Sequence, residues 1–286
     1  MLQNALKSSI ILKGEYMIIA ITGSTGDLCS LVAKELAKQG HDLIFVDRNE
    51  EKSKKNAAQI KAAYPNAQIK TVRCDLLDPA AVDNAAKELG SLGAETLILG
   101  AGIYNVPLKT CENGFNNVFN VNFISQYRLA DALAENSKSL KKIVAIGSIA
   151  HTYGEFDLSD VDYSSRKKPS KIYGNSKRVL MAALYERFYS NKIKLSVAHP
   201  GVTLTNMTNH YPKAINGFVK IGIKLFFPSP QKAIRSIVDA VYTDCGYLEW
   251  IGPSVFGVWG KPKKSALKTI KQEESRAIYQ AIKDLV

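Results

Sequence analysis

The chain has 286 residues, of which 46% are hydrophobic, and its 38 lysines and arginines against 26 acids give a formal charge of +12. This length fits one large α/β domain or two small ones, and the composition is that of a globular protein with a sizeable core. The positive charge is dispersed, with local clusters at residues 166–171 and 261–271 that do not interleave aromatic side chains. We therefore expect no nucleic-acid partner, and contact with an anionic membrane surface stays open.

Strand-like and helix-like segments alternate from residue 17 onward. Short apolar, β-branched runs predict strands at residues 17–22, 42–46, 69–74, 96–99, 142–146, 194–198 and 247–251. Apolar residues at helical spacing predict helices at residues 28–39, 49–63, 79–89, 113–135, 173–189 and 230–242. This alternation predicts α/β architecture, a single doubly wound domain in which a parallel sheet of about seven strands has helices on both faces. We place an N-terminal extension at residues 1–16, the domain at 17–260, and a basic tail or helix at 261–286.

A glycine-containing loop joins the first predicted strand to the first predicted helix. It reads Thr22-Gly23-Ser24-Thr25-Gly26-Asp27-Leu28-Cys29. Glycines at this junction let the backbone approach a pyrophosphate, which the N-terminus of the helix attracts. Cys29 replaces a third glycine, and Asp27 puts a carboxylate near the expected phosphates. A plain tight turn with Asp27 as the helix cap is therefore the alternative.

An acid and a base follow one another at the end of the second predicted strand. Asp47 lies 24 residues after Gly23 and is followed by Arg48. An acid here can accept hydrogen bonds from both adenosine ribose hydroxyls of NAD, and a neighbouring arginine can hold the 2′-phosphate of NADP. We favour NAD, because Asp47 would repel that phosphate. In the alternative interpretation, Arg48 is an ordinary solvated charge.

Tyr173 and Lys177 lie four residues apart, so on a helix their side chains share one face. A lysine ammonium there can lower the pKa of the phenol and make it a usable acid or base. Two further pairs have the same spacing, Tyr163/Lys167 and Tyr279/Lys283. Only Tyr173 and Lys177 follow the fifth strand and open an apolar-striped helix, which selects this pair.

The remaining reactive residue types show no metal-site or disulfide pattern. The four cysteines, Cys29, Cys74, Cys111 and Cys245, are widely scattered, and the four histidines lack an acid or second histidine at ligand spacing. We expect no metal and a reduced, cytoplasmic setting. No apolar run reaches the ~18 residues of a spanning helix. Residues 1–16 show no small-residue cleavage site, so we expect no secretory signal.

Residues 17 to about 206 resemble the short-chain dehydrogenase/reductase family, whose members have a Rossmann fold. The matching segments, in the family's order, are Asp75 after the third strand, Gly100-Ala101-Gly102, Asn-Val-Asn-Phe-Ile-Ser around Asn122, Ile-Gly-Ser-Ile-Ala-His around Ser148, Tyr173 to Lys177, and His199-Pro200-Gly201-Val202-Thr203-Leu204-Thr205. Gly100 departs from the family's asparagine at that position.

The resemblance implies a catalytic tetrad of Asn122, Ser148, Tyr173 and Lys177. Tyr173 would deliver a proton to a carbonyl oxygen or remove one from an alcohol, and Ser148 would donate to the developing alkoxide. Lys177 would lower the pKa of the phenol and bind the nicotinamide ribose, and Asn122 would hold a water that links Lys177 to solvent. The implied cofactor contacts are Gly23, Ser24, Thr25, Gly26, Asp27, Leu28, Asp47, Arg48, Asp75, Leu76, Gly100, Ala101, Gly102, Tyr173, Lys177, Pro200, Gly201, Val202 and Thr205.

The gap of 25 residues from Ser148 to Tyr173 is longer than in many family members. Two branches share a long gap, the sugar-nucleotide epimerases and dehydratases and the retinol-dehydrogenase-like enzymes. Ser148-Ile-Ala-His151 is more similar to the second branch, and a carbonyl-reductase-like enzyme is also compatible. Residues 206–228 match the family's substrate lid, and their apolar stretch suggests a hydrophobic substrate. A membrane-surface helix, given the spacing of Lys220 and Lys224, and a helix packed on its own domain stay open.

We therefore expect an NAD(P)-dependent oxidoreductase that interconverts a hydroxyl and a carbonyl on a small, fairly apolar molecule. The alternatives are an isomerase that retains its NAD and a non-catalytic regulator that senses the cofactor. Family resemblance further implies a homodimer or homotetramer.

Overall fold

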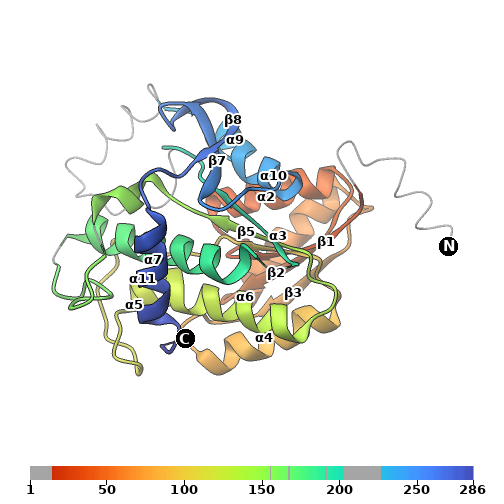
Figure 1. Ribbon diagram of the computed structural model, residues 1–286. Coiled ribbons are helices and arrows are strands. Elements are labelled where there is room, and N and C mark those ends of the chain that lie inside the picture. Colours follow the sequence, from red (N-terminus) through yellow and green to blue (C-terminus); the bar gives the residue numbers. More distant parts are fainter. Residues whose placement is uncertain (1–14, 155, 167, 191, 203–226, 286) are drawn as a thin grey trace, which may run out of the picture.

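The structure, a computed structural model, describes residues 15–154, 156–166, 168–190, 192–202 and 227–285. Its centre is an eight-stranded sheet with the order β3-β2-β1-β4-β5-β6-β7-β8 (Figure 1). The strands are β1 (Ile18–Thr22), β2 (Asp42–Asp47), β3 (Ile69–Arg73), β4 (Thr96–Leu99), β5 (Lys142–Ile146), β6 (Lys194–Ala198), β7 (Glu249–Val255) and β8 (Trp259–Ala266). The first seven are parallel and β8 is antiparallel to β7. The predicted sheet of about seven parallel strands is confirmed, with one antiparallel strand added.

Apolar side chains cover both faces of this sheet, as expected for parallel strands with helices on each side. Along β1, Ile19 and Ile21 lie in one core cluster and Ala20 in the other. The first cluster takes side chains from α2 (Asp27–Lys38), α3 (Glu50–Ala63) and α10 (Arg235–Tyr242). The second takes side chains from α4 (Pro79–Ser91), α6 (Ser125–Asn136), α7 (Pro169–Phe188) and α11 (Gln272–Ile282). The predicted helices on both faces are thus confirmed (Figure 1).

The strand order places a ligand crevice at the centre of the sheet. From β1 the chain moves outward to β2 and β3, then returns to β4 on the other side of β1 and continues to β7. The loops that leave β1 and β4 therefore diverge at the carboxyl ends of these strands. Open α/β sheets bind their ligands at this kind of topological switch point.

The segment expected as one helix at residues 113–135 begins later and is divided. Asn116 caps it, because its side chain accepts from the amide of Phe119 at 2.8 Å, and a bridge between Thr110 and Asn116 holds the preceding residues. Three pieces follow: α5 (Asn117–Phe119), the π-helical turn η1 (Asn120–Ile124) and α6. Such π-helical turns often occur at functional sites, and Asn122 lies inside this one.

The helix that carries Tyr173 also begins earlier than its pattern indicates. The apolar spacing predicts a start at residue 173, whereas α7 starts at Pro169. Proline is well suited to a first helical turn, where its missing N–H has no partner to lose. Tyr173 and Lys177 therefore lie inside a formed helix, which holds both side chains on one face.

The segments at the two ends of the predicted domain are described in part. Of the N-terminal extension only Glu15 and Tyr16 are described, and of the lid at residues 206–228 only Phe227 and Pro228. The residues predicted as a basic tail contribute most of β8 and all of α11, which packs on α7. Within the described ranges, no helix is both long and apolar enough to cross a lipid bilayer.

Candidate active site

Two glycines shape the loop that follows β1. Gly23 has a φ of +68°, and a Cβ there would lie 2.8 Å from the Cα of Ala101, so the position accepts only glycine. Gly26 is the N-cap residue of α2, and its amide donates to the carbonyl of Gly23 at 2.9 Å. Asp27 is therefore the first residue of the helix and not its cap. First-turn amides of a helix lack carbonyl partners within it, so this closely packed loop fits the predicted pyrophosphate.

The two departures from the family pattern face each other beside this loop. Cys29 stands at the third glycine position, and Gly100 stands at the asparagine position. A Cβ on Gly100 would lie 2.3 Å from Cys29 Sγ and 3.0 Å from the carbonyl oxygen of Thr22. Cys29 thus fills the space that a side chain at residue 100 would need. Burial raises the pKa of the Cys29 thiol to about 12, so the group stays neutral and serves as packing.

The carboxylate of Asp47 is turned into the protein. It accepts hydrogen bonds from Ser24 Oγ at 2.5 Å and Ser53 Oγ at 2.8 Å. The amide and hydroxyl of Thr25 also donate to it, each at 3.3 Å. A carboxylate has about four acceptor positions, and four donors already use them here. Asp47 therefore ties the glycine loop to β2 and α3, in addition to lining the cleft where the ribose was expected.

Basic side chains stand at the rim of the cleft next to Asp47. Arg48 and Lys52 are exposed, and both line the cleft together with Asn49. Asn49 caps α3 by accepting from the amide of Lys52 at 2.9 Å. The sequence predicts Arg48 as a cofactor contact, whereas Lys52 gave no signal because it lies on a polar helix. Together they make this rim cationic.

The proposed acid and its partner serine meet at the floor of the cleft. Ser148 follows β5 and caps the 3₁₀ turn η2 (Ile149–Tyr153), where its hydroxyl accepts from the amide of Ala150 at 3.1 Å. Tyr173 reaches the same point from α7, and the Ser148 side chain lies near enough to lower the pKa of its phenol. Tyr104 packs edge-on against the Tyr173 ring at 5.4 Å between centroids. Burial raises the pKa of the Tyr173 phenol to about 12, and the Ser148 side chain offsets this only in part.

Lys177 lies beneath Tyr173 and is almost fully buried. Its Nζ donates to the carbonyl oxygen of Ile146 at 3.0 Å and lies 5.9 Å from the centroid of the Tyr173 ring. Burial lowers the pKa of this ammonium to about 8. In the protein alone, burial and not the charge of Lys177 decides the direction of the Tyr173 shift, so the lowering of this pKa by Lys177 stays a prediction.

Asn122 is completely buried and holds two parts of the site together. Its Oδ1 accepts from the amide of Ile103 at 2.7 Å, and its Nδ2 donates to the carbonyl of Ile103 at 3.0 Å and to Ser176 Oγ at 3.1 Å. Both amide protons are thus used inside the protein. The side chain fastens the segment after β4 to α7, next to Lys177, and its predicted role in holding a water stays a prediction.

These side chains surround a cleft of about 1000 Å³ at the predicted switch point. The predicted site residues that line it are Gly23, Thr25, Gly26, Asp27, Leu28, Asp47, Arg48, Asp75, Leu76, Gly100, Ala101, Gly102, Ser148, Tyr173, Lys177, Pro200, Gly201 and Val202. Ser24 and Asn122 lie behind this lining, and Thr205 lies outside the described residues. Sequence reasoning missed a second group, Ile103, Tyr104, Val106, Pro107 and Tyr153, because the first four lie in an irregular loop and Tyr153 in the short turn η2, neither of which has a periodic pattern.

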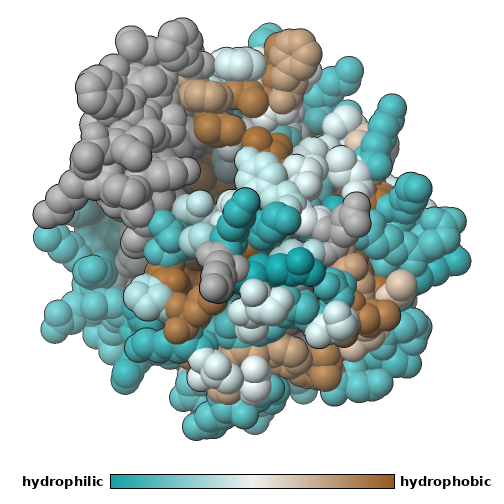
Figure 2. Space-filling view, turned by 90° about the vertical axis from the view of Figure 1, so that its left-hand side faces the viewer, coloured by the Kyte–Doolittle hydropathy of each residue, from teal (hydrophilic) through white to brown (hydrophobic). Residues whose placement is uncertain are grey.

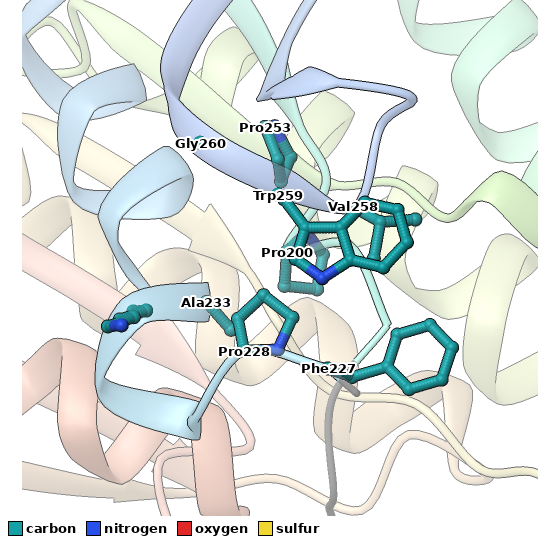
Figure 3. Close-up of a pocket in the computed structure, with 9 residues that line it drawn as sticks. Pro200, Phe227, Pro228, Ala233, Pro253, Val258, Trp259 and Gly260 are labelled. Atoms are coloured by element: carbon teal, nitrogen blue, oxygen red, sulfur yellow. The ribbon is translucent and has the colours of Figure 1, made fainter. Parts of the chain in front are cut away.

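A smaller apolar pocket of about 260 Å³ adjoins the cleft (Figure 3). Pro200 lines both cavities. Phe227 and Trp259 flank the small pocket with their rings stacked at 5.9 Å between centroids and 8° between planes. Phe227 and Pro228, the described end of the predicted lid, thus lie beside the cleft.

A family model described as short chain dehydrogenase matches residues 17–216, well over half of the chain. The chain therefore belongs to the short-chain dehydrogenase/reductase family. Among described residues, no group of three histidines, cysteines or acids is placed to hold a metal ion. The chain is accordingly an oxidoreductase with an NAD(P)-binding fold that acts on alcohols or carbonyls.

Curated relatives are similar over most of the chain. Retinol dehydrogenase 13 from Mus musculus is 27% identical over 81% of this chain and 72% of its own length. Polyprenol dehydrogenase from Homo sapiens is 24% identical, over 79% and 72%. The chloroplastic short-chain dehydrogenase TIC 32 A from Brassica napus is 26% identical, over 80% and 77%.

Solved structures confirm the fold. An uncharacterised protein from Mycobacterium paratuberculosis superposes with a TM-score of 0.75 at 23% identity, over 94% of this chain and 92% of that one. A short-chain dehydrogenase from Sphingobium yanoikuyae in complex with NADPH gives 0.59 at 20%, over 79% and 84%. One from Burkholderia phymatum in complex with NAD gives 0.60 at 18%, over 81% and 86%.

Proposed function

We propose that the protein reduces a carbonyl on a small, fairly apolar molecule, with Tyr173 as the general acid. The observation that carries this proposal is the meeting of Tyr173 and Ser148 at the floor of the cleft, above the buried Lys177. Two hydroxyls that line the same part of one cleft can converge on one substrate oxygen. When bound, the nicotinamide cofactor supplies or accepts the hydride.

The raised pKa of Tyr173 suits a proton donor. Burial raises the pKa of the phenol to about 12, so the group is protonated at neutral pH in the cofactor-free protein. A protonated phenol can give its proton to the alkoxide that forms from a carbonyl, and Ser148 can donate to the same oxygen. Oxidation would require the phenolate first. Lys177, with its pKa of about 8, is largely charged at neutral pH and would hold the nicotinamide ribose.

The wall of the cleft beyond Tyr173 supports an apolar substrate. Ile103, Tyr104, Val106 and Pro107 line the same cleft as the proposed catalytic hydroxyls, and the Tyr104 ring packs on that of Tyr173. Such lining favours a hydrophobic ligand with one polar group. The names of two relatives, a retinol dehydrogenase and a polyprenol dehydrogenase, identify apolar alcohols as their substrates. The proposed substrate class for this chain is accordingly an apolar aldehyde or ketone.

We further propose NADPH as the preferred cofactor. The sequence favours NAD because Asp47 would bind the ribose hydroxyls and repel a 2′-phosphate. However, four hydrogen-bond donors of the protein already occupy the buried Asp47 carboxylate, which leaves it little capacity to bind the ribose hydroxyls. Arg48 and Lys52 stand at the rim of the cleft, where their positive charges can attract a 2′-phosphate. Arg48→Ala should raise the KM for NADPH about 10- to 100-fold, the value of a lost charge-assisted hydrogen bond. The KM for NADH should change little in this variant. A larger rise in the KM for NADH than in that for NADPH would instead indicate NAD as the preferred cofactor.

The decisive test is a panel of apolar aldehydes and ketones with NADPH and NADH, run on the wild type and on Tyr173→Phe. If Tyr173→Phe lowers turnover by at least about 100-fold while fluorescence shows that the variant still binds NADPH, the proposal is supported. Equal activity in Tyr173→Phe would exclude Tyr173 as the acid. If the protein copurifies with a cofactor that does not exchange with added NAD(P)H, the alternative of an NAD-retaining isomerase is favoured. If the protein binds the cofactor but turns over none of the substrates, the alternative of a non-catalytic regulator is favoured. Homo-oligomerisation and a cytoplasmic location stay predictions.

A further inference from the structure

An exposed apolar tip ends the hairpin of β7 and β8. Phe256 is 89% exposed, Val255 46% and Trp259 40%. Phe256 also has a φ of +50°, a backbone conformation that is uncommon for a bulky side chain. The hairpin lies at one end of the sheet, at the top of Figure 1, and Figure 2 shows hydrophobic side chains gathered there next to hydrophilic ones. A phenylalanine this exposed has an unfavourable contact with water and marks an interaction surface.

The charges on the hairpin beyond its first residue, and on the segment that follows it, are all positive. Residues 250–272 contain no acid and five lysines, all exposed: Lys261, Lys263, Lys264, Lys268 and Lys271. One of these lysines contacts an acidic side chain at the base of the hairpin: Lys264 Nζ lies 3.5 Å from a carboxylate oxygen of Glu249. It also donates to the backbone carbonyl of Asp244 at 3.3 Å. Among the described residues, Lys261 and Lys263, which stand nearer the tip, form no ion pair.

We propose that the hairpin tip docks the protein on an anionic lipid bilayer. Val255 and Phe256 enter the interfacial layer, and Lys261 and Lys263 contact the acidic headgroups. Aromatic side chains favour the level of the headgroups, and each lysine near an anionic surface adds to binding. Apolar insertion plus a basic cluster supplies the two signals that stable peripheral attachment needs.

The charge and backbone of β8 argue against a second copy as the occupant. Paired with itself across a two-fold axis, this surface would bring its lysines together. Strand addition at the free edge of β8 is also opposed, because Pro262 lacks an amide donor and lysines flank it. Single-stranded nucleic acid needs several free ring faces, whereas the Trp259 ring is stacked on Phe227 and Phe256 stands alone.

Docking at this tip would bring the mouth of the active-site cleft towards the membrane. A Cβ on Gly201 would lie 3.2 Å from the carbonyl oxygens of Gly257 and Val258, so the hairpin tip packs directly on the segment that lines the cleft. Trp259 lines the small pocket that shares Pro200 with the cleft (Figure 3). An apolar substrate dissolved in the bilayer would then have a short path to Tyr173. This consequence rests on the proposed function, whereas the docking itself does not.

The test measures co-sedimentation of the full chain with vesicles of phosphatidylcholine alone or with phosphatidylglycerol added. Binding should require the anionic lipid and weaken as salt rises. Phe256→Ser should lower the partition coefficient about tenfold, and the double variant Lys261→Gln/Lys263→Gln about 30-fold. The matched control is Lys55→Gln/Lys61→Gln on α3, which removes the same charge from an exposed face and should bind as the wild type.

A spectroscopic signal reports the position of the tip. The chain has two tryptophans, so Trp250→Phe leaves Trp259 as the single reporter, whose emission should shift to the blue on anionic vesicles. Equal loss of binding in the control double variant, or equal binding to neutral vesicles, would overturn the proposal. So would a dimer that Phe256→Ser abolishes, or oligonucleotide binding lost in the same variants. None of these readouts involves turnover, so a failed enzyme assay leaves this test unaffected.

Discussion

Arg178 is a buried cation that joins the catalytic helix to the C-terminal segment, and its removal gives the sharpest stability prediction. It follows Lys177 on α7, and its side chain is 8% exposed. Its Nε and Nη2 each donate to Glu274 of α11 at 2.6 Å. Its Nη2 also donates to the carbonyl of Thr269 at 2.8 Å, and its Nη1 to that of His151 at 3.1 Å.

These bonds support the catalytic serine from behind. His151 lies in η2, which Ser148 caps, and its Nδ1 lies 2.6 Å from the carbonyl oxygen of Ser148. Its Nε2 lies 2.5 Å from Thr269 Oγ1. Burial lowers the pKa of this imidazole, so it is neutral. A neutral ring that donates from Nδ1 to the carbonyl accepts at Nε2 from the threonine, which fixes the tautomer.

Arg178→Leu should lower the free energy of unfolding by about 3 kcal/mol. Breaking a buried, hydrogen-bonded ion pair by removing one partner costs about 3–5 kcal/mol. The lower end applies because the Glu274 side chain is 24% exposed and can regain water. Glu274→Leu should cost more, since it strands the better buried cation. The double variant should lose less than the sum of the two, with a coupling energy of about 2 kcal/mol.

Urea unfolding of the four proteins measures this cycle. Arg166→Leu is the control, because Arg166 pairs with Asp157 at 2.7 Å on the surface, with side chains 43% and 30% exposed, and such pairs contribute about 0–1 kcal/mol. A loss below about 1 kcal/mol in Arg178→Leu, or strict additivity in the cycle, would refute the role of Arg178 as an anchor.

Three further predictions follow from buried groups. Burial lowers the pKa of His41 and of His199 to about 4. As the pH falls, these histidines bind protons in the unfolded chain before they do so in the folded protein, so the free energy of unfolding should be full above pH ~6.5 and should decrease towards pH 4 by about 3 kcal/mol per histidine. Urea unfolding as a function of pH should show a shallower decrease in His199→Gln. Gly100→Ala should lower the free energy of unfolding in urea by about 1–3 kcal/mol, and adding Cys29→Gly to this variant should restore most of the loss. If the second substitution restores nothing, Cys29 does not fill the space that a side chain at residue 100 would need. Asp47→Ala should weaken NADH and NADPH binding alike by loosening the glycine loop, whereas a selective loss of NADH would indicate a ribose ligand.

The order of elements could be predicted from the sequence, and with it most of the site. Apolar runs and helical spacing define the parallel sheet, and the carboxyl ends of parallel strands share one edge. Residues far apart in the chain, such as Asn122, Ser148 and Tyr173, must therefore meet there. The sequence also selects Tyr173 from three equivalent pairs: Tyr163 lies in a polar stretch just ahead of Pro169, Tyr279 lies outside the order of the sheet, and only Tyr173 opens an apolar-striped helix after the Ser148 strand.

The properties that depend on side-chain packing could not be predicted. Asp47 has the position of a ribose ligand in the sequence, but its direction depends on Ser24, Thr25 and Ser53, which approach it only in the fold. The space beside Gly100 depends on Cys29 across the loop. Likewise β8 is rich in lysine and contains proline, a composition of low strand propensity, and only its pairing with β7 makes it a strand.

The part of the chain beyond the family match contacts the proposed site from outside. Residues 17–216 match the family model and contain the four residues that we propose as the catalytic tetrad. The described residues 227–285 then supply Thr269 and Glu274, which brace η2 and α7, as well as Trp259 at the pocket beside the cleft. These residues touch the same floor from the opposite side, so changes there should alter substrate choice and membrane attachment while the proton donor itself stays in place.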